Sequence, residues 1–268
     1  MSRWVRLKAK VAIGRKPYLP GDWAYIGSQF AEQLIGEGRA DYGPELREEV
    51  GGDAGVVYVA YGGLAVSEAR NSILSVRGFH PDLPVAIVSD EDPLINGVAF
   101  LHHEDEDPGA RAAKLAVCEL TPFERTLYLD ADTVVVSSLG GGFGLLERFD
   151  MALACDLTGA DKGVLAGLDT YYDEEREATR RELPSPFVTQ YACGMIFFRR
   201  NDSVASFFKV WREEWERWRW RDQGAFLRAI HRSPVRHVAL PTEWNVSGQR
   251  REAMVVHHRW GAARRPGQ

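Results

Sequence analysis

The sequence predicts an α/β protein that has a mostly parallel sheet with flanking helices and a small β-rich module at the N-terminus. From residue 55 onward, short apolar runs of strand-forming residues are separated by segments with helical spacing. Strands that are buried on both faces and separated by helices are typical of parallel sheets. Residues 1–45 differ, because they alternate as strands do and end in a polar connector that contains glycines.

Three segments of the N-terminal module predict its strands and its one helix. RWVRLKAKVAIG (3–14) alternates in strand fashion, LPGDWAYI (19–26) supplies a turn and a second strand, and SQFAEQLIGEGRA (28–40) has helical spacing. The module faintly resembles a short module of phage structural proteins. A stabilising N-terminal extension explains the same pattern, so both interpretations stay open.

Residues 55–268 are expected to form one domain of alternating strands and helices. Residues 64–79 and 110–120 have helical spacing, and residues 204–231 predict one or two helices rich in tryptophan. In such sheets, ligands bind beyond the carboxyl ends of the strands. Strands are predicted in GVVYVAYG (55–62), PVAIVSD (84–90), RTLYLDAD (125–132), MALACD (151–156), CGMIFFRR (193–200), RHVAL (236–240) and AMVVHH (253–258).

Composition narrows the class of protein. The 268 residues carry a formal net charge of −5, with 45% hydrophobic and 26% charged residues, which argues against attraction of the whole surface to nucleic acid or anionic membrane. No window has the length and apolarity of a membrane span, and no apolar leader follows the basic N-terminus. Cys118, Cys155 and Cys193 are expected to be free thiols. We therefore expect a cytoplasmic protein of a bacterium or a phage-infected cell, in an oligomeric state that the sequence leaves open.

The stretch ERTLYLDADTVVV (124–136) contains the strongest chemical signal. Asp130 and Asp132 interrupt an apolar strand, where carboxylates are costly unless a positive charge meets them. Mg²⁺ or Mn²⁺ held against phosphates would supply that charge. In an extended chain, residues i and i+2 lie on one face, and the small Ala131 between them leaves room for a phosphate. The alternative is an aspartate pair that only caps a turn.

This stretch and the helix before it resemble a known family. RAAKLAVCELTPFERTLYLDADTVVV is similar to the segment with the DxD motif in nucleotide-sugar glycosyltransferases of the GT-A fold, above all family eight, which includes glycogenin and bacterial lipooligosaccharide galactosyltransferases. The similarity extends from 55 to 261 and continues in order through VVYVAYGG, YACGMIFFRRN, RDQGAF and VVHHRWG. It implies a GT-A (Rossmann-like) fold for residues 55–268 and metal-dependent transfer of a hexose from a UDP-sugar to a hydroxyl acceptor. The implied outcome is retention of anomeric configuration; an inverting enzyme would instead need a carboxylate as general base.

The resemblance also implies roles for individual residues. It assigns Asp130 and Asp132 to Mn²⁺ (or Mg²⁺) and the diphosphate, with His258 as a third ligand and His257 as its competitor. The acceptor stays open between a glycan, a protein and a hydroxymethylated DNA base, the last of these suggested by the basic termini and the phage-like module and not by the resemblance. The cofactor-binding residues it implies are Tyr61, Gly62 and Asp90 near the nucleoside, Arg111 and Lys114 near the diphosphate or sugar, and Asp130, Ala131 and Asp132; the catalytic residues are Asp156, Asp222 and Gln223.

Some features depart from the family pattern or have two interpretations. Ala192 stands where the family commonly has asparagine, which leaves the sugar open. Segment 157–186 is expected to form a flap or short helix on the acceptor side. Trp211, Trp215, Trp218 and Trp220 either line an acceptor groove or pack against the sheet; the helical spacing of the first three favours packing.

Two other functions compete with glycosyl transfer. A sugar nucleotidyltransferase would also use metal-binding aspartates on an α/β sheet, but AYGGLAVSEARN (60–71) lacks the lysine of a phosphate loop. A phage-associated protein could bind a nucleotide sugar without turnover.

Overall fold

The computed structural model describes residues 2–13, 16–18, 23–42, 53–104, 111–156, 173–185, 188–247 and 255–257. The chain divides into two compact units, Met1–Glu48 and Glu49–Gln268.

The N-terminal unit contains an antiparallel three-stranded sheet, a hairpin and one helix. Its small core consists of Val11, Ala31, Leu34 and Ala40, so that one face of the helix packs against the strands. The sheet has the order β4-β1-β5, and β2 pairs with β3. The elements are β1 (Ser2–Leu7), β2 (Val11–Ile13), β3 (Lys16–Tyr18), β4 (Trp23–Gly27), α1 (Ser28–Gly36) and β5 (Ala40–Tyr42).

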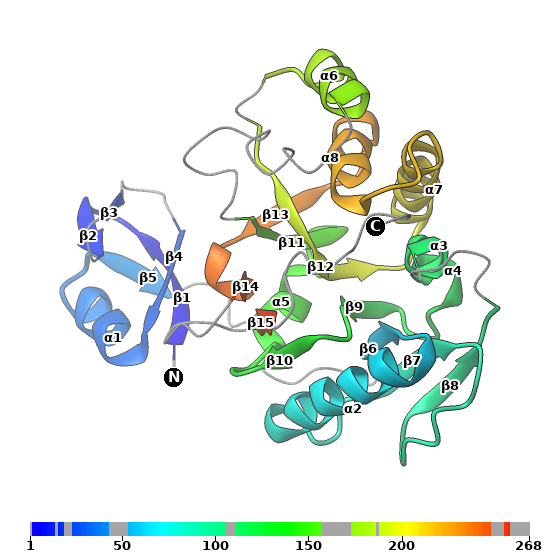
Figure 1. Ribbon diagram of the computed structural model, residues 1–268. Helices are drawn as coiled ribbons and strands as arrows, with labels where there is room; N and C mark the ends of the chain where they lie inside the picture. Colours follow the sequence, from blue (N-terminus) through cyan, green and yellow to red (C-terminus); the bar gives the residue numbers. More distant parts are fainter. Residues whose placement is uncertain are drawn as a thin grey trace. The chain divides into compact units, whose positions relative to one another are not determined.

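The second unit is built on a seven-stranded sheet with the order β13-β11-β12-β9-β6-β7-β8 (Figure 1). Strand β12 is antiparallel to both of its neighbours, and all other neighbouring pairs in this sheet are parallel. The mostly parallel α/β sheet predicted from the sequence is thus confirmed. The strands are β6 (Ala54–Val59), β7 (Val85–Ser89), β8 (Ala99–His102), β9 (Arg125–Leu129), β11 (Met151–Cys155), β12 (Tyr191–Arg199) and β13 (His237–Leu240).

Helices cover both faces of this sheet. The main core, with Tyr128, Phe198 and Trp211, lies under α3 (Arg111–Leu115), α4 (Val117–Leu120), α7 (Asp202–Glu216) and α8 (Asp222–Arg232). The opposite face meets α2 (Gly62–Phe79), whose Ser72 bonds to Tyr58 of β6, and α5 (Gly140–Leu145), where Phe143 stacks edge-on against Phe197. Helix α6 (Asp173–Glu182) contacts α8.

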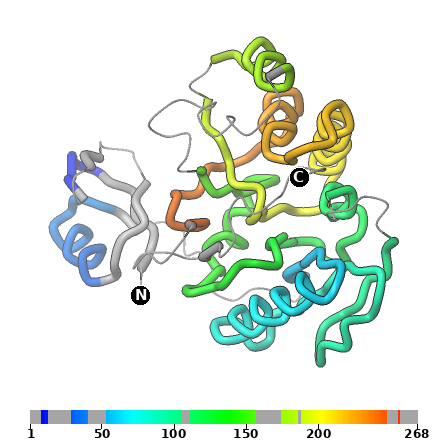
Figure 2. The backbone as a smooth tube through the Cα atoms, in the orientation of Figure 1, coloured from blue at the N-terminus to red at the C-terminus, as the bar shows by residue number. Residues whose placement is uncertain are grey.

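A second small sheet adjoins the end of β9. It has the order β10-β15-β14, formed by β10 (Thr133–Val135), β15 (Val255–His257) and β14 (Val246–Ser247), which follows the 3₁₀ turn η3 (Thr242–Trp244). The course of the chain from β9 through β10 into α5 can be followed in Figure 2. Strand β10 is antiparallel to β15, and Thr133 pairs with His257. The described end of β15 therefore lies beside the residue that follows Asp132.

Several expectations are corrected in detail. Residues 111–120 form two short helices instead of one, and at the break between them the Ala116 N–H is shared between the carbonyls of Ala112 and Ala113, each at 3.1 Å. Residues 204–231 form two helices, one of the two outcomes that the sequence predicted. Strand β8 was not predicted, because as an edge strand it shows only a partly buried, weakly alternating pattern.

The tryptophans belong to the core. Trp211, Trp215 and Trp220 are buried, and Trp218 is partly buried, so the acceptor-groove interpretation is wrong for the three buried rings. Cys118, Cys155 and Cys193 are free thiols, as expected. None of the described helices is long and apolar enough to cross a membrane.

Asp150 ties three strands together at the edge opposite the DxD motif. Its carboxylate accepts hydrogen bonds from Arg199 at 2.9 Å, from the Asn201 side chain at 3.0 Å and from the Arg236 backbone N–H at 3.1 Å. Burial alone would raise the pKa of Asp150, but the hydrogen bonds from Arg236 and Arg199 lower it from 3.8 to about 2.

We expect Asp150→Asn to destabilise the protein by about 2 kcal/mol at pH 7, because the bonds to charged donors are weakened. A carboxylate with a lowered pKa stabilises the fold above its unfolded pKa, and this contribution is lost as the pH falls through the folded value. The difference in urea midpoint between wild type and Asp150→Asn should therefore be full above pH 4 and shrink toward pH 2. A difference that stays constant over this range would contradict this assignment.

Candidate active site

The site residues lie at one edge of the large sheet. The parallel strands β6, β9 and β11 end there, and the antiparallel β12 begins there, since Tyr191 pairs with Cys155. Each strand end supplies a polar residue: Tyr61 follows β6, Asp130 follows β9 and Asp156 follows β11. Asp222, the first residue of α8, approaches from the helix layer.

A cavity of about 350 Å³ opens at this edge. It is bounded by the ends of β6 and β9, the first two turns of α2, helix α3 and the start of α8. Most of the residues that the sequence assigned to the nucleotide and metal therefore meet in one place. The lining residues are Val59, Tyr61, Ala65, Glu68, Arg111, Lys114, Tyr128, Asp130, Ala131, Asp132 and Asp222.

The buried ammonium of Lys114 connects two carboxylates of this cavity. Its Nζ lies 3.1 Å from Asp130 Oδ1 and 2.7 Å from Asp222 Oδ2, and 5.1 Å from the centre of the Tyr128 ring. The Tyr128 hydroxyl donates to the same Asp130 oxygen at 2.6 Å. Lys114 is only 8% exposed, so these contacts replace the water that its charge would otherwise bind.

The electrostatics fix the protonation of this group. Burial would lower the pKa of Lys114, but the charges of Asp130 and Asp222 raise it well above its usual value, so the lysine is charged at neutral pH. Burial, and then the charge of Asp130, raise the pKa of Tyr128, so its hydroxyl keeps its proton and acts as a donor.

The DxD segment forms a turn where an extended chain was expected. Ala131 and Asp132 are in a turn, and the Thr133 hydroxyl closes it by donating to the Asp130 carbonyl at 2.8 Å. The expectation that both aspartates share a strand face was thus wrong as geometry, yet the turn brings both into the lining of the cavity. A hydroxyl relay from Thr133 through Ser72 to Tyr58, with both links at 2.9 Å, anchors the turn to α2 and β6.

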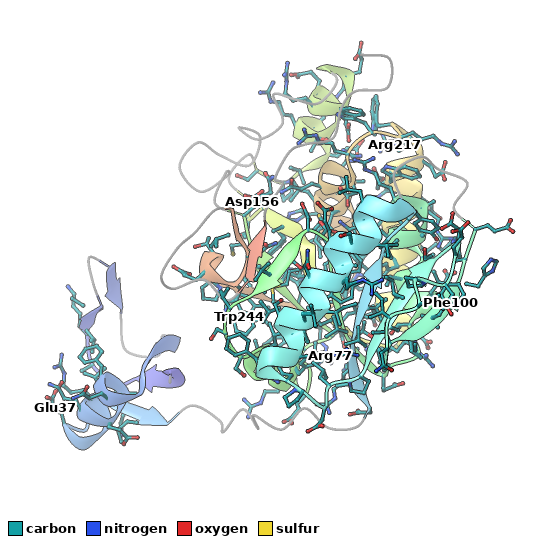
Figure 3. The ribbon with its side chains drawn as sticks, turned by 60° about the horizontal axis from the view of Figure 1, so that its bottom comes forward. Glu37, Arg77, Phe100, Asp156, Arg217 and Trp244 are labelled. Atoms are coloured by element: carbon teal, nitrogen blue, oxygen red, sulfur yellow. The ribbon has the colours of Figure 1, made fainter. Side chains whose placement is uncertain are left out.

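A second polar cluster surrounds Asp156, which is labelled in Figure 3. The side-chain amide of Gln223 donates to Asp156 Oδ2 and to the Tyr191 carbonyl, the latter at 3.2 Å. The Gln190 amide donates to the same carboxylate oxygen at 3.4 Å. Because Gln223 follows Asp222 on α8, one helix start joins this cluster to the cavity.

Of the residues expected near the nucleoside, some lie at the cavity and one lies outside it. Tyr61 lines the cavity, and its hydroxyl is fixed by His103, at 3.0 Å from Nδ1 and 2.9 Å from the carbonyl. Gly62 starts α2 with φ +76°, a left-handed conformation that favours glycine. Asp90 is exposed at the end of β7, outside the lining of the cavity.

The lining fits a divalent cation by its chemistry. Glu68, Asp130, Asp132 and Asp222 oppose Arg111 and Lys114, which leaves an excess of negative charge, and Asp130 already accepts a cationic partner. No cluster of three or more His, Cys, Asp or Glu side chains with metal-ligand geometry occurs among the described residues. His258 lies outside those residues, and of His257 only the backbone is described.

Sequence reasoning missed four lining residues, the apolar Val59 and Ala65 and the polar Tyr128 and Glu68. Tyr128 stands two residues before Asp130, so strand alternation places both on one face, and this signal could have been used. Glu68 has no such signal, because a glutamate on an amphipathic helix is usually a solvated residue.

Comparison with solved structures now adds a finding about the fold. Galactosyltransferase LgtC in complex with donor and acceptor sugar analogues matches with a TM-score of 0.51 and 14% identity, over 76% of this chain and 86% of that one. The bifunctional glycosyltransferase WbbM matches with a TM-score of 0.55 and 16% identity, over 78% of this chain and 46% of that one. The glycosyltransferase GlyE of Streptococcus pneumoniae TIGR4 matches with a TM-score of 0.51 and 12% identity, over 76% of this chain and 54% of that one. The chain has a GT-A fold.

This fold agrees with the family resemblance read from the sequence. A second LgtC structure, at 14% identity and a TM-score of 0.53, carries a Gln-to-Glu change described as an active-site mutation. No protein-family model and no curated protein sequence matches the chain significantly.

Proposed function

We propose that the protein is a metal-dependent glycosyltransferase that moves a hexose from a UDP-sugar to a hydroxyl acceptor. The observation that carries this proposal is the cavity at the carboxyl edge of the sheet, which Asp130 and Asp132 line together with Arg111 and Lys114. Carboxylates and cations side by side suit a ligand that is itself a metal-bound diphosphate. The GT-A fold supports the same assignment.

Each part of the cavity has a role in this proposal. Asp130 and Asp132 would hold Mn²⁺ or Mg²⁺, with His258 as a third ligand; His257, next to it in sequence, pairs by its backbone with Thr133. When bound, the ion would supply positive charge to the leaving diphosphate. Arg111 and Lys114 would bind diphosphate oxygens, and Tyr61 would contact the uridine.

The sugar would lie toward the second cluster, where Asp222 borders the cavity and Gln223 contacts Asp156. The side-chain amides of Gln223 and Gln190 both donate to the Asp156 carboxylate and hold it in one orientation. In that orientation the carboxylate would accept hydrogen bonds from sugar hydroxyls. LgtC also has a glutamine in its active site. If the reaction retains the anomeric configuration, these groups orient the sugar and the departing phosphate takes the proton of the acceptor hydroxyl. If it inverts the configuration, one of the carboxylates acts as the general base.

The proposal is tested by incubating the protein with UDP-glucose, UDP-galactose and UDP-N-acetylglucosamine plus Mn²⁺ and measuring UDP release. We expect release from one donor, including slow hydrolysis without acceptor, and loss of this release with EDTA. A panel of simple sugars, peptides and hydroxymethylated DNA then identifies the acceptor class. Binding of a UDP-sugar without any UDP release would favour a binding protein and contradict the proposal.

A further inference from the structure

A lysine occupies a cation position between two carboxylates of the cavity. The Lys114 ammonium contacts Asp130 at 3.1 Å and Asp222 at 2.7 Å, and it is almost fully buried. Asp130 is the aspartate proposed to bind the metal, so the protein's own cation and the metal ion would use the same carboxylate.

We infer that Lys114 competes with the divalent cation for Asp130, so that the ion binds tightly only together with the diphosphate of the donor. This inference rests on the proposed function and adds a binding order to it. Without a diphosphate, a metal ion that binds Asp130 must either displace the buried Lys114 ammonium or bind against its electrostatic repulsion. A diphosphate offers the ammonium a new negative partner, which frees Asp130 for the ion.

The geometry gives Lys114 a way to leave Asp130 without losing all its partners. Its shorter contact is to Asp222, the first residue of α8, whereas Asp130 follows the carboxyl end of β9. The ammonium can therefore turn toward a diphosphate while it stays paired with Asp222. Lysine suits this exchange, because it is a point charge on a flexible stem and makes no fixed bidentate contact.

The consequence is a measurable coupling between two ligands. If UDP removes Lys114 from Asp130, UDP must tighten Mn²⁺ binding, and Mn²⁺ must tighten UDP binding by the same factor. The charge balance of the lining gives the expected direction for a variant. Loss of the lysine adds one uncompensated negative charge, which attracts the ion even without UDP.

The experiment is a titration of the full chain with Mn²⁺, with and without UDP, in which free Mn²⁺ is followed by electron paramagnetic resonance. For Lys114→Met we expect Mn²⁺ affinity without UDP to rise about 10- to 100-fold, and the tightening by UDP to fall by a similar factor. Lys114→Arg keeps the charge and should keep weak Mn²⁺ binding without UDP. If Lys114→Met does not fold, Lys114→Gln carries the same expectation.

Arg111→Met is the matched control, because it removes one positive charge from the same cavity one helical turn away. We expect it to weaken UDP binding and to change Mn²⁺ affinity without UDP much less than Lys114→Met does. Unchanged coupling in Lys114→Met, or an equal gain in Arg111→Met, would overturn the inference and leave the proposed function intact. A wild-type protein that binds no Mn²⁺ even with UDP would overturn both.

Discussion

The double variant Asp130→Asn/Asp132→Asn is expected to lose metal-dependent UDP release by a factor on the order of 10³. Both side chains line the cavity, and Asp130 also forms an ion pair with Lys114. Asparagine keeps the size of each side chain but removes the charge that would hold a divalent cation. The measurement is the initial rate of UDP release at saturating Mn²⁺ and donor, with circular dichroism to check the fold.

Asp82→Asn is the control for this variant. Asp82 is exposed in a turn after α2 and lies outside the lining of the cavity, so the loss of its charge should leave the rate unchanged. A folded Asp130→Asn/Asp132→Asn protein that releases UDP at the rate of the Asp82→Asn control would show that the aspartates are a structural turn.

The largest effect on stability is expected for Arg228→Met. The Arg228 side chain is fully buried and donates to Glu214 at 2.7 Å, to Glu175 at 3.2 Å and to the Thr179 hydroxyl at 2.6 Å. It links α8 to both α6 and α7. Its removal would leave the buried carboxylate of Glu175 without its ion-pair partner and would take one of three arginines from Glu214, which also pairs with Arg217 and Arg232. An unpaired buried carboxylate of this kind costs about 3–5 kcal/mol of the free energy of unfolding.

Urea unfolding at neutral pH measures this effect. Arg219→Met is the matched control, because Arg219, which follows the end of α7, forms an exposed ion pair with Glu216 at 2.6 Å, and exposed pairs contribute little. We expect almost no change for the control. A loss in Arg228→Met no larger than in the control would show that the buried network does not hold these helices together.

The sequence was sufficient for most of the main sheet. Continuous apolar runs such as 55–59 and 125–129 predict buried strands, because only strands covered on both faces lack polar alternation. Direction was not predictable in the same way: β12 is as uniformly buried as its neighbours, yet it is antiparallel to both. Side-chain pattern reports burial on each face and contains no information about strand polarity.

The site was predicted less completely. Asp130, Asp132 and Lys114 were identified by motif, and the structure places all three at one cavity. The contact of Lys114 with Asp222 joins residues more than a hundred positions apart, which local spacing cannot reveal. The turn at Asp132 depends on Thr133 and its hydroxyl partner Ser72 on α2, which is again a tertiary contact.

The most direct test of the central claim is a crystal of the full chain soaked with Mn²⁺ and UDP. The account predicts an anomalous Mn²⁺ peak in contact with the carboxylates of Asp130 and Asp132 and with the diphosphate, and UDP in the cavity between α2 and α3. Bound UDP with the Mn²⁺ peak elsewhere, or with both carboxylates turned away from the ion, would contradict it.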